Sequence, residues 1–261
     1  MERLPITVCV IANSDPRLAL ALDSVKEWVA EMIVVLNDDT DPATAKIARD
    51  RGAKVFREPW RGHVAQKNSA ADKAGQPWLL GLDADEAVSE LLRADIQRLF
   101  AAPVRLASRA AWRFPRCAEY YGRWIRHGDW YPDWQTRLWQ RGLARWGGID
   151  PHDKLMVDGA VGRLKGDLLH YSQESFDQVW MKAHRYAEDF VRTRRQAGKT
   201  VSRRDLFFRP PWRFFRCYLL LGGFLDGWQG YSIACMTAAY TYLRYAKAYE
   251  SQLIKTPPRA D

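Results

Sequence analysis

The stretch Leu79-Leu80-Gly81-Leu82-Asp83-Ala84-Asp85-Glu86 passes from an apolar run directly into three carboxylates within four positions. The apolar run is typical of a buried strand. Because side chains alternate between the two faces of a strand, we expect Asp83 and Asp85 to leave its end on the same side. Paired oxygen donors of this kind suit Mg²⁺ or Mn²⁺ carrying a diphosphate. The alternative is an acidic turn that caps a helix beginning near Ser89.

Strands and helices alternate through the first hundred residues. Apolar runs predict strands at Ile6–Ile11, Met32–Leu36, Ala53–Phe56 and Trp78–Leu82. Helical spacing predicts helices between them, at Leu18–Trp28, Ala43–Arg51 and His63–Ala74. This order is typical of an α/β fold with a mostly parallel, doubly wound sheet. In such sheets ligands bind beyond the carboxyl ends of the strands, where Asn37–Asp41 and Asp83–Glu86 both lie.

The rest of the chain has a different pattern. Residues 103–172 are rich in Trp, Arg and Gly, with short strands expected at Ala111–Phe114, Gln135–Trp139 and Leu168–Tyr171. A helical pattern follows over 175–197, and an amphipathic, aromatic tail over 203–253. The longest uncharged run of this tail, Gly227–Leu243, has 17 residues. A spanning helix needs about 20 apolar residues, so we expect this run to lie in a membrane interface instead.

The net charge of +9 is concentrated in one segment of the 261-residue chain. Residues 192–216 hold nine basic residues and one acidic residue, Asp205. A localised positive charge favours an anionic partner, either nucleic acid or acidic lipid. The four cysteines lack the spacing of a metal site, so we expect reduced thiols in a cytosolic protein and no zinc. The short apolar run Ile6–Ala12 predicts a strand rather than a secretory signal.

Several motifs along the chain match one known family. They are Thr40-Asp41, Gly52–Val55, Pro59–Gly62, Gln66–Asn68, Leu82–Glu86, Gly122–Gly128, Trp130–Asp133, Gly162–Leu164, Gly166–Tyr171 and Gly223–Gly230. With them the chain resembles the family 2 glycosyltransferases of GT-A fold. Within that family it is similar to the lipopolysaccharide core glycosyltransferases of the WaaE/KdtX type, which add β-1,4-linked glucose to inner-core heptose. The matches cover nearly the whole chain.

Three positions depart from the family's pattern. Leu36 stands where the family usually has the aspartate of its nucleotide-base loop, with Asn37, Asp38 and Asp39 just beyond. The early Lys-Asn-Glu of the family appears here within Ala12–Asp15. The carboxylate of the family's Val-His-Glu is shortened by one methylene at Asp153.

On the donor side, the resemblance implies a nucleotide sugar, UDP-glucose, bound together with a divalent cation. Asp83 would face the ribose or the metal, and Asp85 would ligate the metal that bridges the donor phosphates. His170 would complete the metal shell, with a buried core histidine as the alternative. Lys67 would pair with the diphosphate or the base, unless it is a solvated helix lysine. Asp38 would lie in the base-binding loop, and its alternative is a turn aspartate bonded to its own backbone.

An inverting transfer needs one carboxylate to take the proton from the attacking acceptor hydroxyl. Asp153 is the matching residue, after a Gly147-Gly148 loop that can approach a sugar. Asp133 is the alternative base, or else orients the acceptor or pairs with Arg137. Aromatic rings stack on sugars and arginines pair with phosphates, so the acceptor residues expected on an acidic core are Trp124, Arg126, Trp130 and Tyr131, with core packing as the alternative for the rings.

The sequence thus predicts a metal-dependent, inverting hexosyltransferase, peripheral on the cytoplasmic face of the inner membrane. Its partners would be a nucleotide sugar, a lipid-linked inner-core acceptor and an anionic membrane surface, with no nucleic acid. The expected domains are a catalytic domain over 1–172, with a nucleotide-sugar half (1–102) and an acceptor half (103–172), and a helical basic-aromatic region over 173–261. Other possibilities are transfer to another lipid-linked or cell-surface glycan, a nucleotidyltransferase, or a basic lipid- or nucleic-acid-binding module. The last would give no reason for Asp83 and Asp85.

Overall fold

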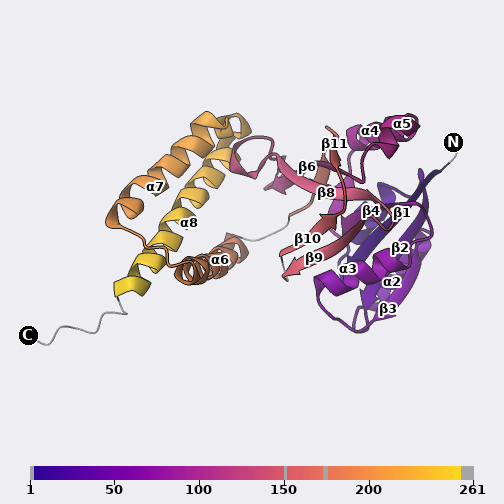
Figure 1. The fold of residues 1–261 in the computed structure, drawn as a ribbon, viewed down its shortest axis with the longest axis horizontal. Coiled ribbons are helices and arrows are strands. Elements are labelled where there is room, and N and C mark those ends of the chain that lie inside the picture. Colours follow the sequence, from indigo (N-terminus) through magenta and orange to yellow (C-terminus); the bar gives the residue numbers. More distant parts are fainter. Residues whose placement is uncertain (1–2, 150–151, 173–175, 254–261) are drawn as a thin grey trace, which may run out of the picture. The chain divides into compact units, whose positions relative to one another are not determined.

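The computed structural model describes residues 3–149, 152–172 and 176–253. The chain divides into two compact units, which are described separately (Figure 1). The sheet unit comprises Met1–Ala118 and Asp133–Tyr171, and the helical unit comprises Glu119–Pro132 and Ser172–Asp261. The division expected from the sequence left residues 119–132 with the sheet, whereas the structure groups them with the C-terminal helices.

The first half of the sheet unit is a parallel sheet with helices between its strands. The four strands, in the order β3-β2-β1-β4, are β1 (Leu4–Ala12), β2 (Val29–Asn37), β3 (Lys54–Glu58) and β4 (Trp78–Asp83). The connecting helices are α1 (Leu18–Asp23), α2 (Pro42–Asp50) and α3 (His63–Asp72). The predicted alternation is confirmed, although α1 ends five residues earlier than Trp28 and the chain then forms turns.

Side-chain alternation along the strands produces a core on each face of the sheet. Ile6, Val8 and Val10 of β1 belong to one buried cluster, and Cys9 points into a second cluster on the opposite face. Helices cover both faces, so the central strands are buried throughout and read as continuous apolar runs. This is why their sequences show little polar alternation.

The second half of the sheet unit adds antiparallel strands. The order continues from β4 as β8-β6-β12-β5, and β8 is antiparallel to both of its neighbours. The strands are β5 (Glu86–Val88), β6 (Ala111–Tyr120), β8 (Asp133–Gln140), β11 (Val161–Arg163) and β12 (Leu168–His170). Two further helices, α4 (Glu90–Phe100) and α5 (Pro103–Ala107), precede β6. The helix expected to begin near Ser89 is α4, and the Ser89 side chain caps it by accepting from the N–H of Leu92. A separate hairpin pairs β9 (Ala144–Ile149) with β10 (His152–Val157).

The helical unit consists of three long helices and the segment 119–132. The helices are α6 (Phe176–Gln196), α7 (Arg203–Phe215) and α8 (Gly227–Leu253). A π-helical turn (Arg216–Leu220) and a 3-10 turn (Gly223–Asp226) join α7 to α8, and segment 119–132 contains β7 (Arg123–Trp124) and a 3-10 turn (Gly128–Trp130). Within the residues that the structure describes, no helix is long and apolar enough to cross a membrane.

The motif Gly223–Gly230 fastens segment 119–132 to the helices. Asp226 is buried, and its Oδ2 accepts hydrogen bonds from the backbone N–H groups of Arg126 (3.1 Å) and His127 (2.8 Å). A Cβ atom at Gly230 would lie 1.8 Å from the carbonyl oxygen of Gly223, so the close approach of these two backbones requires glycine. This motif therefore shapes the helical unit.

Candidate functional site

The carboxylates expected at the sheet edge lie where β4 ends and β5 begins. Asp83 is the last residue of β4, Asp85 lies in the intervening turn, and Glu86 starts β5. The backbone N–H of Asp83 donates to Glu86 Oε2 (3.0 Å), which closes the turn. Asp83 and Asp85 are near enough for the charge of one to raise the pKa of the other. The two carboxylates therefore share one edge of the sheet.

Asp83 is held between two buried cations. Its Oδ1 lies 2.8 Å from Lys67 Nζ and its Oδ2 lies 2.7 Å from Arg137 Nη2. Both cations also lie beside the ring of Trp146, at 4.6 Å for Lys67 Nζ and 5.2 Å for the Arg137 guanidinium. Burial raises the pKa of Asp83, but the charges of Arg137 and Lys67 outweigh it and hold that pKa far below its ordinary value. Asp83 is therefore ionised, and each of its carboxylate oxygens is paired with a cation.

The pairing continues in both directions from Asp83 as a charge chain. Lys67 also binds Asp153 (2.9 Å), Arg137 also binds Glu86 (3.2 Å), and Arg116 bridges Glu86 (3.4 Å) to Asp133 (2.8 Å). Its members alternate in sign along Asp153, Lys67, Asp83, Arg137, Glu86, Arg116 and Asp133. Each inner member thus has an opposite charge on both sides. The two carboxylates expected from the sequence as possible bases stand at its two ends.

Glu86 is the most deeply buried member of the chain. Its side chain is fully buried and contacts Arg137, Arg116 and the backbone of Asp83. Burial lowers the pKa of Arg137, but Asp83 and Glu86 reverse this and raise it above the ordinary arginine value. The pKa of Arg116 is raised in the same way, because Glu86 and Asp133 outweigh its burial. Glu86 therefore holds two arginines charged at the site.

The expected pairing of Asp133 with Arg137 is wrong. Asp133 binds Arg116 and accepts a hydrogen bond from Gln135 (2.9 Å), whereas Arg137 binds Asp83 and Glu86. Asp133 and Arg137 are four positions apart on the same strand, β8, which separates them by about 13 Å of extended backbone. Partners within a strand at this spacing are out of reach, so each finds an opposite charge on a neighbouring strand.

Asp85 faces His170 at the same edge. Asp85 Oδ2 lies 3.3 Å from His170 Nε2 and 3.7 Å from Arg17 Nη1. The antiparallel pairing of β12 with β5 brings His170 opposite Glu86, next to this turn. Burial raises the pKa of Asp85, while its hydrogen bond to His170 and the charges of His170 and Arg17 bring it below the ordinary value.

The donor set at this edge fits a cation that arrives with a diphosphate. Among the described residues no group of three or more His, Cys, Asp or Glu side chains could hold a metal by itself. Asp85 and His170 offer two donors, and both oxygens of Asp83 are already engaged by cations. Mg²⁺ is commonly bound by one or two carboxylates together with substrate phosphates. Asp85 and His170 are thus the residues that would hold the metal.

The expected base-binding loop lies at the end of β2. Arg57 Nη1 donates to the carbonyl oxygens of Asp38 and Thr40, both at 3.0 Å, and the Asp38 side chain is exposed. The Thr40 hydroxyl lies 3.2 Å from Asn13 Oδ1, which ties this loop to the loop after β1. Asp41 binds its own backbone, since it accepts from the N–H of Ala43 (2.8 Å) and caps α2. Asp38 therefore remains open to a ligand.

Asp153 lies on the hairpin and not after a glycine loop. It pairs with Gly148 in the register of β9 and β10, so Gly147 and Gly148 belong to a strand, contrary to expectation. Gly148 has φ of +102°, which glycine adopts most readily. Residues 150–151, between the two strands, lie outside the described part of the chain.

The four expected acceptor residues all belong to segment 119–132 of the helical unit. Trp130 packs edge-on against Tyr120, with ring centroids 5.4 Å apart, and is partly buried. Arg126 is exposed, while Trp124 and Tyr131 are partly buried. The three rings are thus packed on one side and exposed on the other, so they are not simply core residues.

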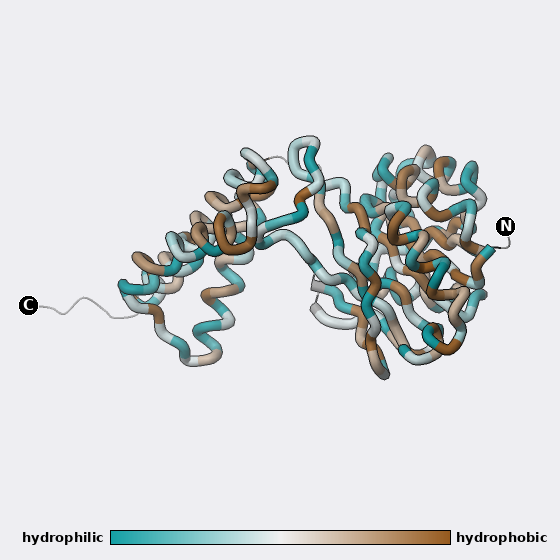
Figure 2. The backbone as a smooth tube through the Cα atoms, turned by 90° about the horizontal axis from the view of Figure 1, so that it is seen from above, coloured by the Kyte–Doolittle hydropathy of each residue, from teal (hydrophilic) through white to brown (hydrophobic). Residues whose placement is uncertain are grey.

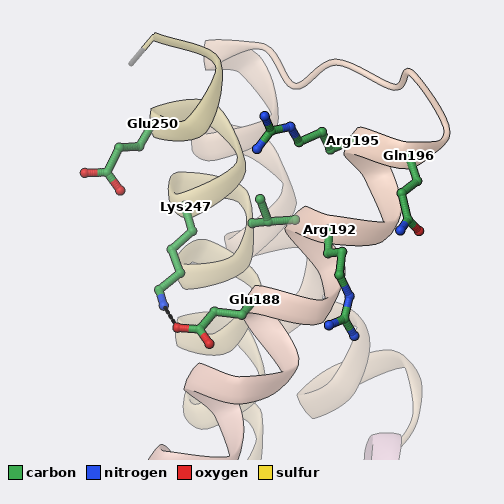
Figure 3. A pocket seen from close by; sticks show the side chains of 7 residues that line it. Glu188, Arg192, Arg195, Gln196, Lys247 and Glu250 are labelled. Atoms are coloured by element: carbon green, nitrogen blue, oxygen red, sulfur yellow. Dashed lines mark hydrogen bonds and ion pairs between the residues drawn. The ribbon is translucent and has the colours of Figure 1, made fainter. Parts of the chain in front are cut away.

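The helical unit also has a surface groove between α6 and α8 (Figure 3). Arg192, Arg195 and Lys247 line it together with Glu188 and Glu250, and Lys247 forms an ion pair with Glu188 at 3.0 Å. The groove mixes both signs of charge and lacks the paired carboxylates of the sheet edge. We therefore assign the candidate site to the sheet edge.

Sequence reasoning missed Glu86, Arg116 and Trp146 as parts of the site, and gave Arg137 the wrong partner. One signal was present: Arg137 is followed by the apolar Leu138-Trp139 in a predicted strand, and a buried arginine needs carboxylate partners. Which carboxylates these are depends on the strand order.

Comparisons with known proteins identify the family of this chain. Residues 7–156, more than half of the chain, match the family described as "Glycosyl transferase family 2", and the chain belongs to that family. It is therefore an enzyme, a glycosyltransferase that uses a nucleotide-sugar donor, and the α/β fold of GT-A type expected from the resemblance is confirmed. Family membership favours this activity over a binding module.

Two relatives match over almost their full length. The lipopolysaccharide core biosynthesis glycosyltransferase LpsC of Rhizobium meliloti is 29% identical over 268 residues, covering 100% of this chain and 98% of LpsC. An uncharacterised glycosyltransferase of Rickettsia typhi is 29% identical, covering 95% of this chain and 87% of the relative. Among solved structures, S. aureus TarS 1–349 in complex with UDP-GlcNAc covers 98% of this chain and 93% of its own, at 13% identity and a TM-score of 0.48.

Proposed function

We propose that this enzyme transfers glucose from UDP-glucose to an inner-core heptose of lipopolysaccharide, with inversion at the anomeric carbon. The name and full-length match of the relative LpsC support a lipopolysaccharide core acceptor. The motifs that resemble core glucosyltransferases support the sugar. The observation that carries the proposal is the charge chain, in which Asp83 at the donor edge and Asp153 share Lys67 at 2.8 and 2.9 Å.

Asp153 acts as the general base in this proposal. Lys67 holds its carboxylate in place, and the Asp153 side chain is 12% exposed, so it lies at the border of the site. As the acceptor oxygen bonds to the anomeric carbon, its proton passes to Asp153 and the bond from that carbon to the phosphate oxygen breaks. The electron pair of this bond leaves with the nucleoside diphosphate. A single displacement of this kind inverts the anomeric centre.

The donor is held by the carboxyl edge of the sheet. Asp83, fixed by Lys67 and Arg137, faces the ribose, and Asp38 lies in the loop that receives the base. Asp85 and His170 are the residues that would hold a divalent cation, and such a cation would supply positive charge beside the departing diphosphate. Lys67 contributes a fixed positive charge beside the donor.

The acceptor is bound by residues of segment 119–132. Trp124, Trp130 and Tyr131 offer ring faces to sugars. Arg126 is exposed and its guanidinium suits the phosphates or carboxylates of an acidic core. In the sheet unit, Asp133 is the alternative base, at the opposite end of the charge chain from Asp153.

We place the enzyme on the cytoplasmic face of the inner membrane, because the proposed acceptor is linked to lipid. The helical unit supports this placement, since it holds 17 basic and 10 acidic residues, against 23 and 21 in the sheet unit. Seven of the nine net positive charges therefore belong to the helical unit. A cationic unit is attracted to anionic lipid.

The experiment that tests this function is a panel of nucleotide sugars incubated with the protein and Mn²⁺ or Mg²⁺. Release of nucleoside diphosphate is measured with and without inner-core lipid acceptor. We expect UDP-glucose to give the fastest release, and the release to depend on both the acceptor and the cation. Faster release from another nucleotide sugar would show that UDP-glucose is not the donor. Release that is equally fast without the core acceptor would show that the acceptor belongs to another class.

A further inference from the structure

The joint between α7 and α8 carries an unusual apolar surface. Phe208, Trp212, Phe215 and Leu219 follow one another at helical spacing and are 71%, 56%, 42% and 48% exposed. The rings of Trp212 and Phe215 stack with centroids 5.8 Å apart. These four side chains form a stripe along α7 into the π-helical turn.

The stripe continues over the turns that lead into α8. The exposed apolar residues there are Leu220, Leu221, Phe224, Leu225 and Trp228. The hydrophobic colouring of this joint is visible in Figure 2. We call the nine side chains, Phe208 to Trp228, the apolar ridge. With 150–250 Å² for each aromatic side chain, the five aromatic members of the ridge alone expose roughly 400–700 Å², as much as the 300–600 Å² of the largest patch on a typical monomer, and the four leucines add to this.

The arginines of the neighbouring basic segment are largely engaged within the helical unit. Arg213 and Arg216 both bind Asp129, and Arg209 binds Asp205 and lies 4.9 Å from the centre of the Tyr245 ring. Arg192 binds Asp189 at 2.7 Å. The segment that looked like a free cationic surface in the sequence therefore does much of its pairing internally. Its attraction for an anionic surface is weaker than nine free cations would give.

We propose that the apolar ridge inserts into the headgroup–acyl boundary of an anionic bilayer, and that it contributes more to membrane binding than the basic segment does. Aromatic and leucine side chains on a net-cationic helical unit are the composition of an interfacial anchor. The unit's charge of +7 complements anionic lipid. A nucleic acid would use free arginines and leave the leucines of the ridge exposed to water. This inference rests on the proposed function, since the lipid-linked acceptor brings the enzyme to the bilayer.

The test is flotation of the full-length protein with vesicles of 70% phosphatidylcholine and 30% phosphatidylglycerol. Leu220→Gln combined with Leu225→Gln should lower vesicle binding at least tenfold. Arg204→Gln, an exposed cation of α7, should lower it by less than threefold. Leu91→Gln is the control, because Leu91 is an even more exposed leucine on α4 of the sheet unit, and this variant should bind as the unchanged protein does. Binding should also persist at 0.5 M salt, where charge attraction is screened.

Three results would overturn the proposal. The double variant could bind vesicles as well as the unchanged protein does, while its thermal unfolding shows an intact fold. Salt could release the protein completely, which would return the role to the basic segment. Sedimentation could show a dimer that the double variant abolishes, with no vesicle binding by either protein, which would make the ridge an interface between copies.

The transferase proposal is tested separately from the ridge. Nucleoside diphosphate release with a detergent-free, deacylated core acceptor should be equal in the double variant and the unchanged protein. If both proteins release none, the transferase proposal fails while the flotation result still stands. If both release it equally and float equally, the ridge proposal alone fails.

Discussion

In the sheet unit, carboxylates and cations alternate along seven side chains and end at Asp153 and Asp133, whereas the helical unit uses its buried carboxylates to tie its own segments together. Asp129 binds Arg213 and Arg216, and Asp226 binds the backbone of residues 126 and 127. Both units thus give their buried carboxylates polar or charged partners. In the sheet unit these carboxylates lie at the carboxyl ends of strands, the edge at which ligands bind in such sheets.

The difference shows how to separate a site from a scaffold when both hold buried ion pairs. A carboxylate that is buried and bonded to the backbone of its own unit, as Asp226 is, cannot reach a ligand. The charge chain ends at carboxylates that are partly exposed, Asp153 and Asp133, and Asp85 beside it is also partly exposed. Substitutions of the buried carboxylates in the two units should therefore differ in kind, with loss of donor binding in the sheet unit and loss of stability without loss of donor binding in the helical unit.

The largest effect is expected at Asp153. Asp153→Asn removes the proposed base while Lys67 keeps its partner Asp83, so donor binding should be retained. The rate of transfer should fall about 10²–10⁴-fold, the usual contribution of a general base. Steady-state kinetics against UDP-glucose measure the fall in kcat and the unchanged KM. Asp133→Asn is the matched variant, and a larger loss there would move the base to the other end of the charge chain.

A somewhat smaller effect is expected at Asp85. Asp85→Asn keeps the shape of the side chain and removes the anionic ligand, and a metal contribution of several kcal/mol corresponds to about 10²–10³-fold in rate. Initial rates over a Mn²⁺ titration should show weaker metal dependence as well as slower transfer. Asp50→Asn, an exposed aspartate on α2, serves as the control. Full activity of Asp85→Asn in EDTA-treated buffer would refute metal dependence.

Substitutions of Glu86 and Asp226, one in each unit, allow the two units to be compared directly. Glu86→Gln leaves the buried Arg137 and the partly buried Arg116 with one carboxylate partner fewer, and breaking a buried pair costs about 3–5 kcal/mol of unfolding free energy. Asp226→Asn weakens hydrogen bonds to backbone N–H groups, for which about 1–3 kcal/mol is expected. Urea unfolding gives both values. Affinity for UDP-glucose should fall only in Glu86→Gln, and an equal fall in Asp226→Asn would remove the distinction between the units.

The smallest effect is expected on the stability of the fold at acid pH. The pKa of Asp205 in the helical unit is lowered to about 2, chiefly by its hydrogen bond to Arg209, and that of Asp83 is lowered further still. A carboxyl whose folded pKa is depressed stabilises the fold above its unfolded pKa of about 3.9. That stabilisation is lost as pH falls through the folded pKa.

On acidification from pH 4, Asp205 should therefore be half protonated at about pH 2 while Asp83 is still ionised. Carboxyl ¹³C shifts followed by NMR measure both groups in one titration. Protonation of Asp83 before Asp205 would mean that Lys67 and Arg137 do not clamp it as described.

Much of the sheet unit could be predicted because its signals are local. The apolar runs fixed the four parallel strands, and the carboxylates after β4 were placed at the correct edge from strand direction alone. The partners of those carboxylates could not be predicted in the same way. Arg137 reaches Asp83 only because β8 inserts beside β4, and this pairing joins residues 54 positions apart.

The helical unit was harder to predict for a related reason. Segment 119–132 packs with the C-terminal helices through hydrogen bonds to Asp226, about a hundred positions further along the chain. No local sequence pattern predicts that contact. The basic segment was evident from composition, but its pairing with Asp129 was not. Composition gives the sum of charges, and only the fold shows which of them are already paired.

The central claim is a single displacement assisted by one carboxylate, and the linkage that the enzyme forms tests it most directly. The unchanged protein is incubated with UDP-glucose, whose glucose is α-linked, and a core acceptor, and NMR of the product gives the anomeric configuration. The account predicts a β-linked glucose on heptose. An α-linked product would contradict it, because a single back-face displacement at the α-linked carbon of UDP-glucose can give only the β-linked product.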